Sequence, residues 1–143
     1  MKINSLNPAK LLTVSALFFV IALSQILIGC PLASGGNTPT DTLTYLTVFK
    51  DGSGGVDGLA TAWSVAVSQD GKNVYVTGVE DDALAVFNRD TNTGELTYST
   101  VFKNGIGGVD GLAAAWSVAV SQDGKNVYVT GVEDDALAVF NRD

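Results

Sequence analysis

The sequence predicts an all-β fold made from two copies of one antiparallel sheet. Residues 43–90 recur as residues 96–143, at an offset of 53 positions. Only four paired positions differ: Leu46/Ser99, Asp51/Asn104, Ser53/Ile106 and Thr61/Ala114. In each copy, short apolar runs alternate with turn residues such as Asp-Gly, which is typical of β-hairpins. Self-similarity at this period indicates a repeat architecture, in which neighbouring units bury their faces against one another.

Four strands are expected in the first copy, at residues 64–68, 73–77, 83–87 and 96–102. The third of these strands carries apolar side chains on both faces, as a sheet packed between two others requires. A longer Gly-rich link leads to the next copy. Four antiparallel strands followed by such a link is the layout of a β-propeller blade. We therefore expect about two blades, preceded by a helical signal peptide.

Two blades are fewer than the four to eight that typically close a propeller. The chain holds one complete blade, a leading outer strand at Leu43–Lys50, and a trailing three-strand set at Trp116–Asn141. The leading strand is predicted to complete the second blade. Exposed edges and apolar faces would remain. The chain is therefore either a fragment of a longer propeller or a subunit of a homo-oligomeric ring, in which three copies supply six blades and four supply eight.

The repeat resembles a known family. Ser64 to Thr77 (SVAVSQDGKNVYVT), followed by Ala83 to Phe87 (ALAVF), resembles the YVTN-type repeat of lactonase-like (6-phosphogluconolactonase-like) bacterial β-propellers, and Ser117 to Phe140 matches equally. Gly78 and Gly131 stand where that repeat has Asn. The resemblance implies a propeller fold. It leaves activity open, because family members include sugar-lactone hydrolases, muconate cyclases and surface proteins without known activity.

The N-terminal residues predict export. Lys2 and Lys10 precede an apolar run, and Leu27-Ile28-Gly29-Cys30 follows it, which describes a secretory signal peptide. The last four residues resemble the bacterial lipobox, which implies acylation of Cys30. The predicted organisation is a lipoprotein signal peptide at 1–29, a tether at 30–42 and propeller repeats at 43–143. A plain signal peptide or a single membrane helix is the alternative. The expected location is the bacterial cell envelope, with the membrane as a partner through the lipid.

An acidic composition limits the possible partners. From Cys30 onward the chain has six basic residues and 15 acidic ones. Nucleic acids and anionic lipid surfaces call for basic patches, so nucleic acid is excluded as a partner. The chain has no histidine, which excludes a hydrolase or cyclase that uses a histidine base. No catalytic residue is expected.

The connections between blades and the turns after each second strand are predicted to share one rim. Clustered carboxylates there could hold Ca²⁺, and Gly52–Ala60 resembles a Ca²⁺-binding nonapeptide. The alternatives are a solvated acidic rim or a docking surface for a basic partner, so we assign no metal or cofactor. The candidate binding residues are Asp57, Glu80, Asp81, Asp82, Asp110, Glu133, Asp134 and Asp135.

Near-identical blades favour binding or structure over catalysis, since an enzyme needs different groups in distinct roles. We therefore expect a lipid-anchored module whose partner is an envelope protein or carbohydrate. The alternatives are a lactonase-like hydrolase of sugar lactones, with carboxylates or Arg89 and Arg142 at an axial site of an assembled ring, and a gene remnant without independent function.

Overall fold

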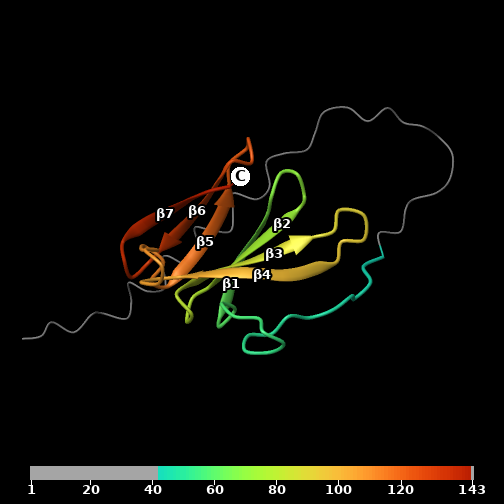
Figure 1. Cartoon of the computed structure of the whole chain (residues 1–143), viewed down its shortest axis with the longest axis horizontal. Helices are drawn as coiled ribbons and strands as arrows, with labels where there is room; N and C mark the ends of the chain where they lie inside the picture. Colours follow the sequence, from blue (N-terminus) through green and yellow to red (C-terminus); the bar gives the residue numbers. More distant parts are fainter. Residues whose placement is uncertain (1–41, 143) are drawn as a thin grey trace, which may run out of the picture. The chain divides into compact units, whose positions relative to one another are not determined.

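The computed structural model describes residues 42–142, which form seven β-strands and no helix (Figure 1). No helix in this range is therefore long and apolar enough to cross a membrane. The predicted signal peptide, Cys30 and nearly all of the predicted tether lie outside the described residues and stay predictions. The strands are β1 (Ala62–Val67), β2 (Asn73–Gly78), β3 (Ala83–Arg89), β4 (Leu96–Lys103), β5 (Ala115–Val120), β6 (Asn126–Gly131) and β7 (Ala136–Asn141).

The strands form two antiparallel sheets in chain order. The first sheet has the order β1-β2-β3-β4 and the second has the order β5-β6-β7. Within each sheet, every strand pairs with its neighbour in the sequence. The four strands predicted for the first copy are confirmed, each to within two residues at either end. The fold is therefore all-β, with sheets that correspond to propeller blades.

The turn between β1 and β2 is held by its own side chains. Ser68 Oγ donates to Asp70 Oδ1 at 2.6 Å, and the backbone N–H of Asn73 donates to Ser68 Oγ at 2.9 Å. Gly71 has a φ of 71°, which glycine adopts at little cost. The second copy repeats both contacts at the same distances. The Ser-Gln-Asp-Gly sequence therefore specifies this hairpin locally.

The prediction of a leading strand at Leu43–Lys50 is wrong, because residues 42–50 have no regular structure. A strand needs a partner edge for its backbone hydrogen bonds. The outer edge of β7, which this segment is predicted to cover, has no partner among the described residues. Phe49 packs instead against Phe87 of β3, with the ring centroids 5.1 Å apart. The second sheet therefore has three strands.

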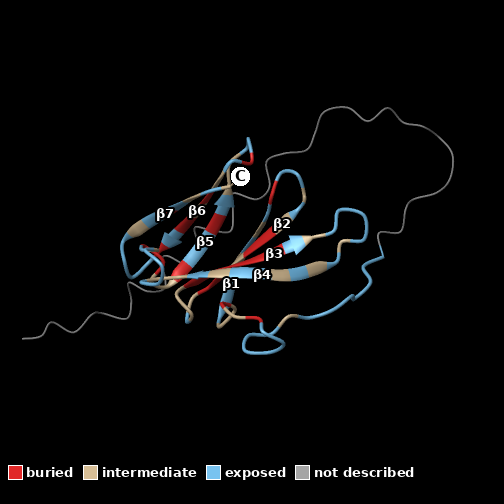
Figure 2. Ribbon diagram, viewed as in Figure 1, coloured by how far each residue is buried: buried red, intermediate tan, exposed pale blue. Residues whose placement is uncertain are grey.

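The main core lies between the two sheets. Tyr75, Leu84 and Val86 of the first sheet pack with residues of the second copy, among them Leu112, Val118, Val127 and Val129. Figure 2 shows buried residues along β2 and β3 in one sheet and β6 in the other. The side chains of Trp63 on β1 and Trp116 on β5 meet between the blades, with ring centroids 4.0 Å apart. The two blades therefore pack face to face through apolar side chains.

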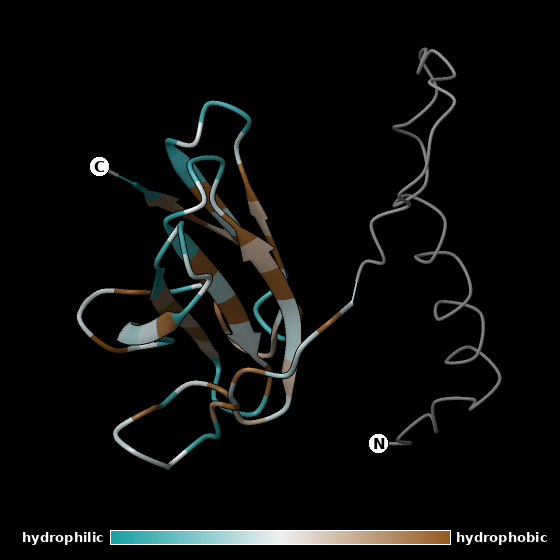
Figure 3. Ribbon diagram, turned by 90° about the vertical axis from the view of Figure 1, so that its right-hand side faces the viewer, coloured by the Kyte–Doolittle hydropathy of each residue, from teal (hydrophilic) through white to brown (hydrophobic). Residues whose placement is uncertain are grey.

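The second face of the β5-β6-β7 sheet is open, whereas that of the first sheet is open only at β1, because Val74, Ala85 and Phe87 on this face are buried in a second, smaller cluster with Val56. On β1, Val65 is 65% exposed, and on β7, Leu137 and Val139 are 59% and 57% exposed. Figure 3 shows apolar residues along strands of both sheets. Tyr75 is a core residue, whereas its repeat counterpart Tyr128 is only partly buried. The predicted exposure of apolar faces is therefore confirmed.

Candidate functional site

Two of the predicted rim residues meet at one lysine. Lys103 Nζ at the end of β4 lies 2.7 Å from Asp57 Oδ1 and 3.4 Å from Asp81 Oδ1. The side chain of Asp57 is half-exposed, whereas that of Asp81 is 17% exposed. Asp57 belongs to the connection before β1, and Asp81 to the turn between β2 and β3. The two kinds of loop therefore do share a rim in this blade.

Asp51 joins this group, although it is not among the predicted residues. One carboxylate oxygen from each of Asp51, Asp57 and Asp81 lies within 4.8 Å of the others. Three such oxygens could hold a hard cation such as Ca²⁺. The same carboxylates also accept backbone hydrogen bonds in the connection: Leu59 N donates to Asp51, Gly58 N to Asp57 and Ala60 N to Asp81. Their evident role is to fix the connection before β1.

The second blade repeats these backbone contacts with one change. Gly111 N donates to Asp110 Oδ1 at 3.0 Å, Ala113 N donates to Asp134 Oδ2 at 2.9 Å, and Asn104 replaces Asp51 as the acceptor for Leu112 N. Asp82 Oδ1 joins the blades, because it accepts a hydrogen bond from Ala114 N at 2.7 Å. Among the described residues, no side-chain hydrogen bond is made by the three remaining predicted residues, Glu80, Glu133 and Asp135.

Acid is expected to loosen the connection at Asp81. Burial raises the pKa of this carboxyl, but the hydrogen bond from Ala60 N and the charge of Lys103 outweigh it, so the net pKa is lowered. A carboxylate with a lowered native pKa stabilises the fold above its unfolded pKa, and this contribution is lost as the pH falls through the native value. The urea midpoint should therefore fall as the pH drops below about 4. Asp81→Asn, which keeps an acceptor for Ala60 N, should lower the midpoint at pH 7 and flatten this pH dependence. An unchanged profile in the variant would contradict this role.

A second constellation lies at the turn between β1 and β2. Arg142 follows β7 in the second blade, and its Nη2 lies 2.6 Å from Asp70 Oδ2 and 3.0 Å from Asn73 Oδ1 in the first blade. Arg142 is the main reason that the pKa of the Asp70 carboxyl lies well below its usual range, and hydrogen bonds from Ser68 and Lys72 add to this effect. Burial raises the pKa of Tyr75, and Arg142 beside it partly opposes the rise. These residues therefore form a guanidinium site between the blades.

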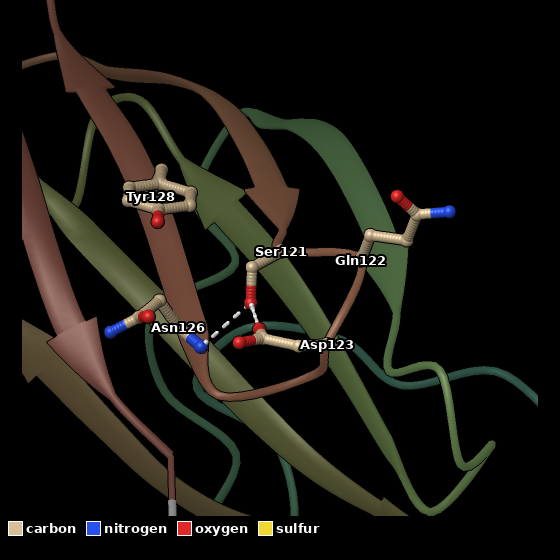
Figure 4. Close-up of a pocket in the computed structure, with 5 residues that line it drawn as sticks. All are labelled: Ser121, Gln122, Asp123, Asn126 and Tyr128. Carbon is tan, nitrogen blue, oxygen red and sulfur yellow. Dashed lines mark hydrogen bonds between the residues drawn. The ribbon is translucent and has the colours of Figure 1, made fainter.

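The corresponding turn of the second blade lines a pocket of about 500 Å³. Figure 4 shows its five residues, with Ser121 between Asp123 and Asn126. The pocket is lined by Ser121, Gln122, Asp123, Asn126 and Tyr128.

Sequence reasoning missed Asp51, Lys103 and the pocket. Asp51 carried a signal, because it is one of the four positions at which the two copies differ. The Asp70–Arg142 pair carried none, since the two residues are 72 positions apart and the pairing depends on how the blades pack.

The comparisons with known proteins support the fold. No protein-family model and no curated protein matches the chain. The chain is similar to the putative 6-phosphogluconolactonase of Bacteroides uniformis, with 17% identity over 62% of this chain and 28% of that one, and a TM-score of 0.51. It also matches the periplasmic gluconolactonase of Pseudomonas aeruginosa, with 25% identity over 55% of this chain and 22% of that one, and a TM-score of 0.47. The chain thus spans less than a third of the length of either protein. The blades have the lactonase-like propeller fold.

Proposed function

We propose that this chain is an exported, lipid-anchored β-propeller module that acts by binding, or as a structural element, at the bacterial cell envelope. Its blades belong to a larger ring, formed either by a longer chain or by several copies. The observation that supports a non-catalytic role is the use of the rim carboxylates. Asp57 and Asp81 in one blade, and Asp110 and Asp134 in the other, accept hydrogen bonds from the same backbone positions. Catalysis would need these groups to differ in role.

The anchor is tested by lipid labelling of the full chain in a bacterial host. Cells fed radiolabelled palmitate should incorporate label into the protein, and the labelled protein should sediment with membranes. Two acyl chains give a stable anchor, whereas a single one is only marginal. The matched control is Cys30→Ser. This variant should carry no label and should not sediment with the membranes as a lipidated protein. Equal labelling of the two proteins, or no label in either, would refute the anchor.

The second candidate is a lactone hydrolase. It is favoured by the fold likeness to a protein named as a putative 6-phosphogluconolactonase. The rim carboxylates would supply the acid and the base, whereas Arg89 and Arg142 lie at the turn between β1 and β2, at the other end of the strands. We expect the purified full chain to hydrolyse a six-carbon sugar lactone no faster than buffer alone. Turnover that is lost in Asp57→Asn and kept in Asp110→Asn would establish the hydrolase instead.

A further inference from the structure

The pocket of the second blade has the same residues that bind a guanidinium in the first. Asp70 Oδ1 accepts hydrogen bonds from Ser68 Oγ at 2.6 Å and Lys72 N at 3.1 Å, which leaves Oδ2 for Arg142. In the pocket, Asp123 Oδ1 accepts from Ser121 Oγ and Lys125 N at the same two distances. Among the described residues, no donor reaches Asp123 Oδ2. The side chains of the pocket are therefore already arranged to bind a guanidinium group.

Asn126 is set in the same way. Asn73 uses its side-chain N–H to donate to Asn88, and its Oδ1 accepts from Nε and Nη2 of Arg142 at 3.3 and 3.0 Å. Asn126 donates to Asn141 at 3.0 Å, so its Oδ1 is also turned to receive a donor. No donor to this oxygen is present in the part of the chain that the structure describes. Asn126 Oδ1 and Asp123 Oδ2 thus offer two acceptors for the paired N–H donors of an arginine guanidinium.

The chain also presents the matching arginine. Arg89 holds the same place in the first copy that Arg142 holds in the second. Arg89 Nη1 donates to Gly71 O at 3.1 Å, as Arg142 Nη1 donates to Gly124 O at 3.1 Å. This is the only hydrogen bond of the Arg89 guanidinium within residues 42–142, so its Nε and Nη2 are available. Pocket and arginine lie on different blades, so one molecule can offer each to a different neighbour.

The exposed apolar side chains of the two blades are repeat counterparts of the side chains that pack together between the blades. Val118 on β5 is 7% exposed, and Leu84 on β3 is 1% exposed, because they lie in the junction between the blades. Their repeat counterparts are Val65, 65% exposed on the first blade, and Leu137, 59% exposed on the second. One molecule therefore carries both halves of a second junction. The internal junction shows how these halves fit together.

The leading segment already lies where the outer strand of a preceding blade would lie. Phe102 of β4 contacts Phe140 of the next blade with ring centroids 5.1 Å apart, and its counterpart Phe49 contacts Phe87 at the same separation. In the first blade, Asn88 of β3 pairs with Thr97 of β4. Asn141 of β7 is the repeat counterpart of Asn88, and Thr44 is the counterpart of Thr97. The same register between two molecules would therefore pair Asn141 of one with Thr44 of the other. Residues 43–50 thus fit the uncovered edge of β7.

We propose that the pocket at Ser121, Asp123 and Asn126 binds Arg89 of a second copy of this chain, in a head-to-tail contact that repeats the internal blade junction. Residues 43–50 of this second molecule become the fourth strand of the sheet β5-β6-β7 in the first molecule. A contact between two different surfaces closes into a ring when the rotation per copy allows it. This inference rests on the part of the proposed function that places the blades in a larger ring.

The first test is a charge exchange, measured as the mass of the full chain in mild detergent over a range of concentrations. The parent should have a discrete mass that is a multiple of the mass of one chain. Arg89→Asp and Asp123→Arg should each shift the mass to that of one chain, and the double variant should restore the multiple. The control is Lys72→Asp. It removes an exposed lysine from the turn between β1 and β2, which Arg89 contacts through Gly71, and it should leave the mass unchanged. A parent with the mass of one chain at every concentration would overturn the proposal.

The second test does not depend on how well those variants fold. Two full chains that carry Cys30→Ser, one with Thr44→Cys and one with Asn141→Cys, are mixed and oxidised. A disulfide should join them, because the proposed register places the two positions opposite each other. Thr97→Cys replaces Thr44→Cys in the control, since Thr97 is the same repeat position already paired with Asn88. Equal cross-linking of both mixtures, or none, would overturn the proposal. These chains lack Cys30, so a failure of assembly is separate from a failure of the anchor.

Discussion

Leu84→Ala is expected to lower the free energy of unfolding by about 2–5 kcal/mol, the usual cost of truncating a fully buried leucine. Leu84 is 1% exposed on β3 and lies in the cluster that joins the two blades. The lost methyl groups leave a cavity between two sheets, which cannot close without moving one blade on the other. Urea unfolding of the full chain, followed by circular dichroism, measures the loss.

Leu137→Ala is the matched control, because Leu137 is the same repeat position and is 59% exposed. In dilute protein this variant should cost less than about 1 kcal/mol, as surface substitutions do. At concentrations where copies associate, its cost should grow, since the proposed contact buries Leu137. Equal losses for the two variants in dilute protein would show that the junction between the blades is not the core described here.

Gly78→Ala is expected to cost about 1–3 kcal/mol or more, the range for forcing extra atoms into a packed site. A Cβ at Gly78 would overlap the carbonyl group of Gly58, lying 2.9 Å from its carbon, and would lie 3.3 Å from Ala60 O. This backbone cannot yield easily, because Asp81 Oδ2 binds Ala60 N at 2.8 Å. The loss should appear in the same urea experiment as a lower midpoint.

Gly105→Ala is the control for replacing a glycine at a position where the added Cβ makes no steric overlap. Its Cβ would meet nothing within 4 Å, but its φ of 74° makes any side chain strained. It should cost about 1–2 kcal/mol from conformation alone. Combining Gly78→Ala with Asp81→Asn should cost less than the sum of the two single losses, because both release the same connection. Strict additivity would contradict the steric explanation.

The regular parts of the fold were predictable because their causes are local. Asp70-Gly71 and Asp123-Gly124 specify hairpins within a few residues, and the alternation of apolar side chains specifies the strands between them. Gly78 illustrates a limit of this reasoning. The sequence shows a glycine where the resembled repeat has Asn, but only the fold reveals that the carbonyl of Gly58 occupies the space of a side chain.

The leading segment and the guanidinium site were not predictable for a common reason. The strand pattern of Leu43–Lys50 is sound, since residues 96–103 have nearly the same sequence and form β4. Whether a strand forms depends on an available partner edge, which local sequence does not encode. In the same way, Asp123 and Asp70 are identical in sequence context, and only blade packing makes one of them the partner of Arg142.

The two indoles in contact give this molecule an intrinsic fluorescence reporter. Trp63 and Trp116 are the only two tryptophans of the chain, and their rings meet at the junction between the blades. All intrinsic tryptophan emission therefore comes from this one place. Separation of the blades will change the emission even where every hairpin stays intact. A difference between the fluorescence and dichroism transitions would then measure how far the two blades unfold as one cooperative unit.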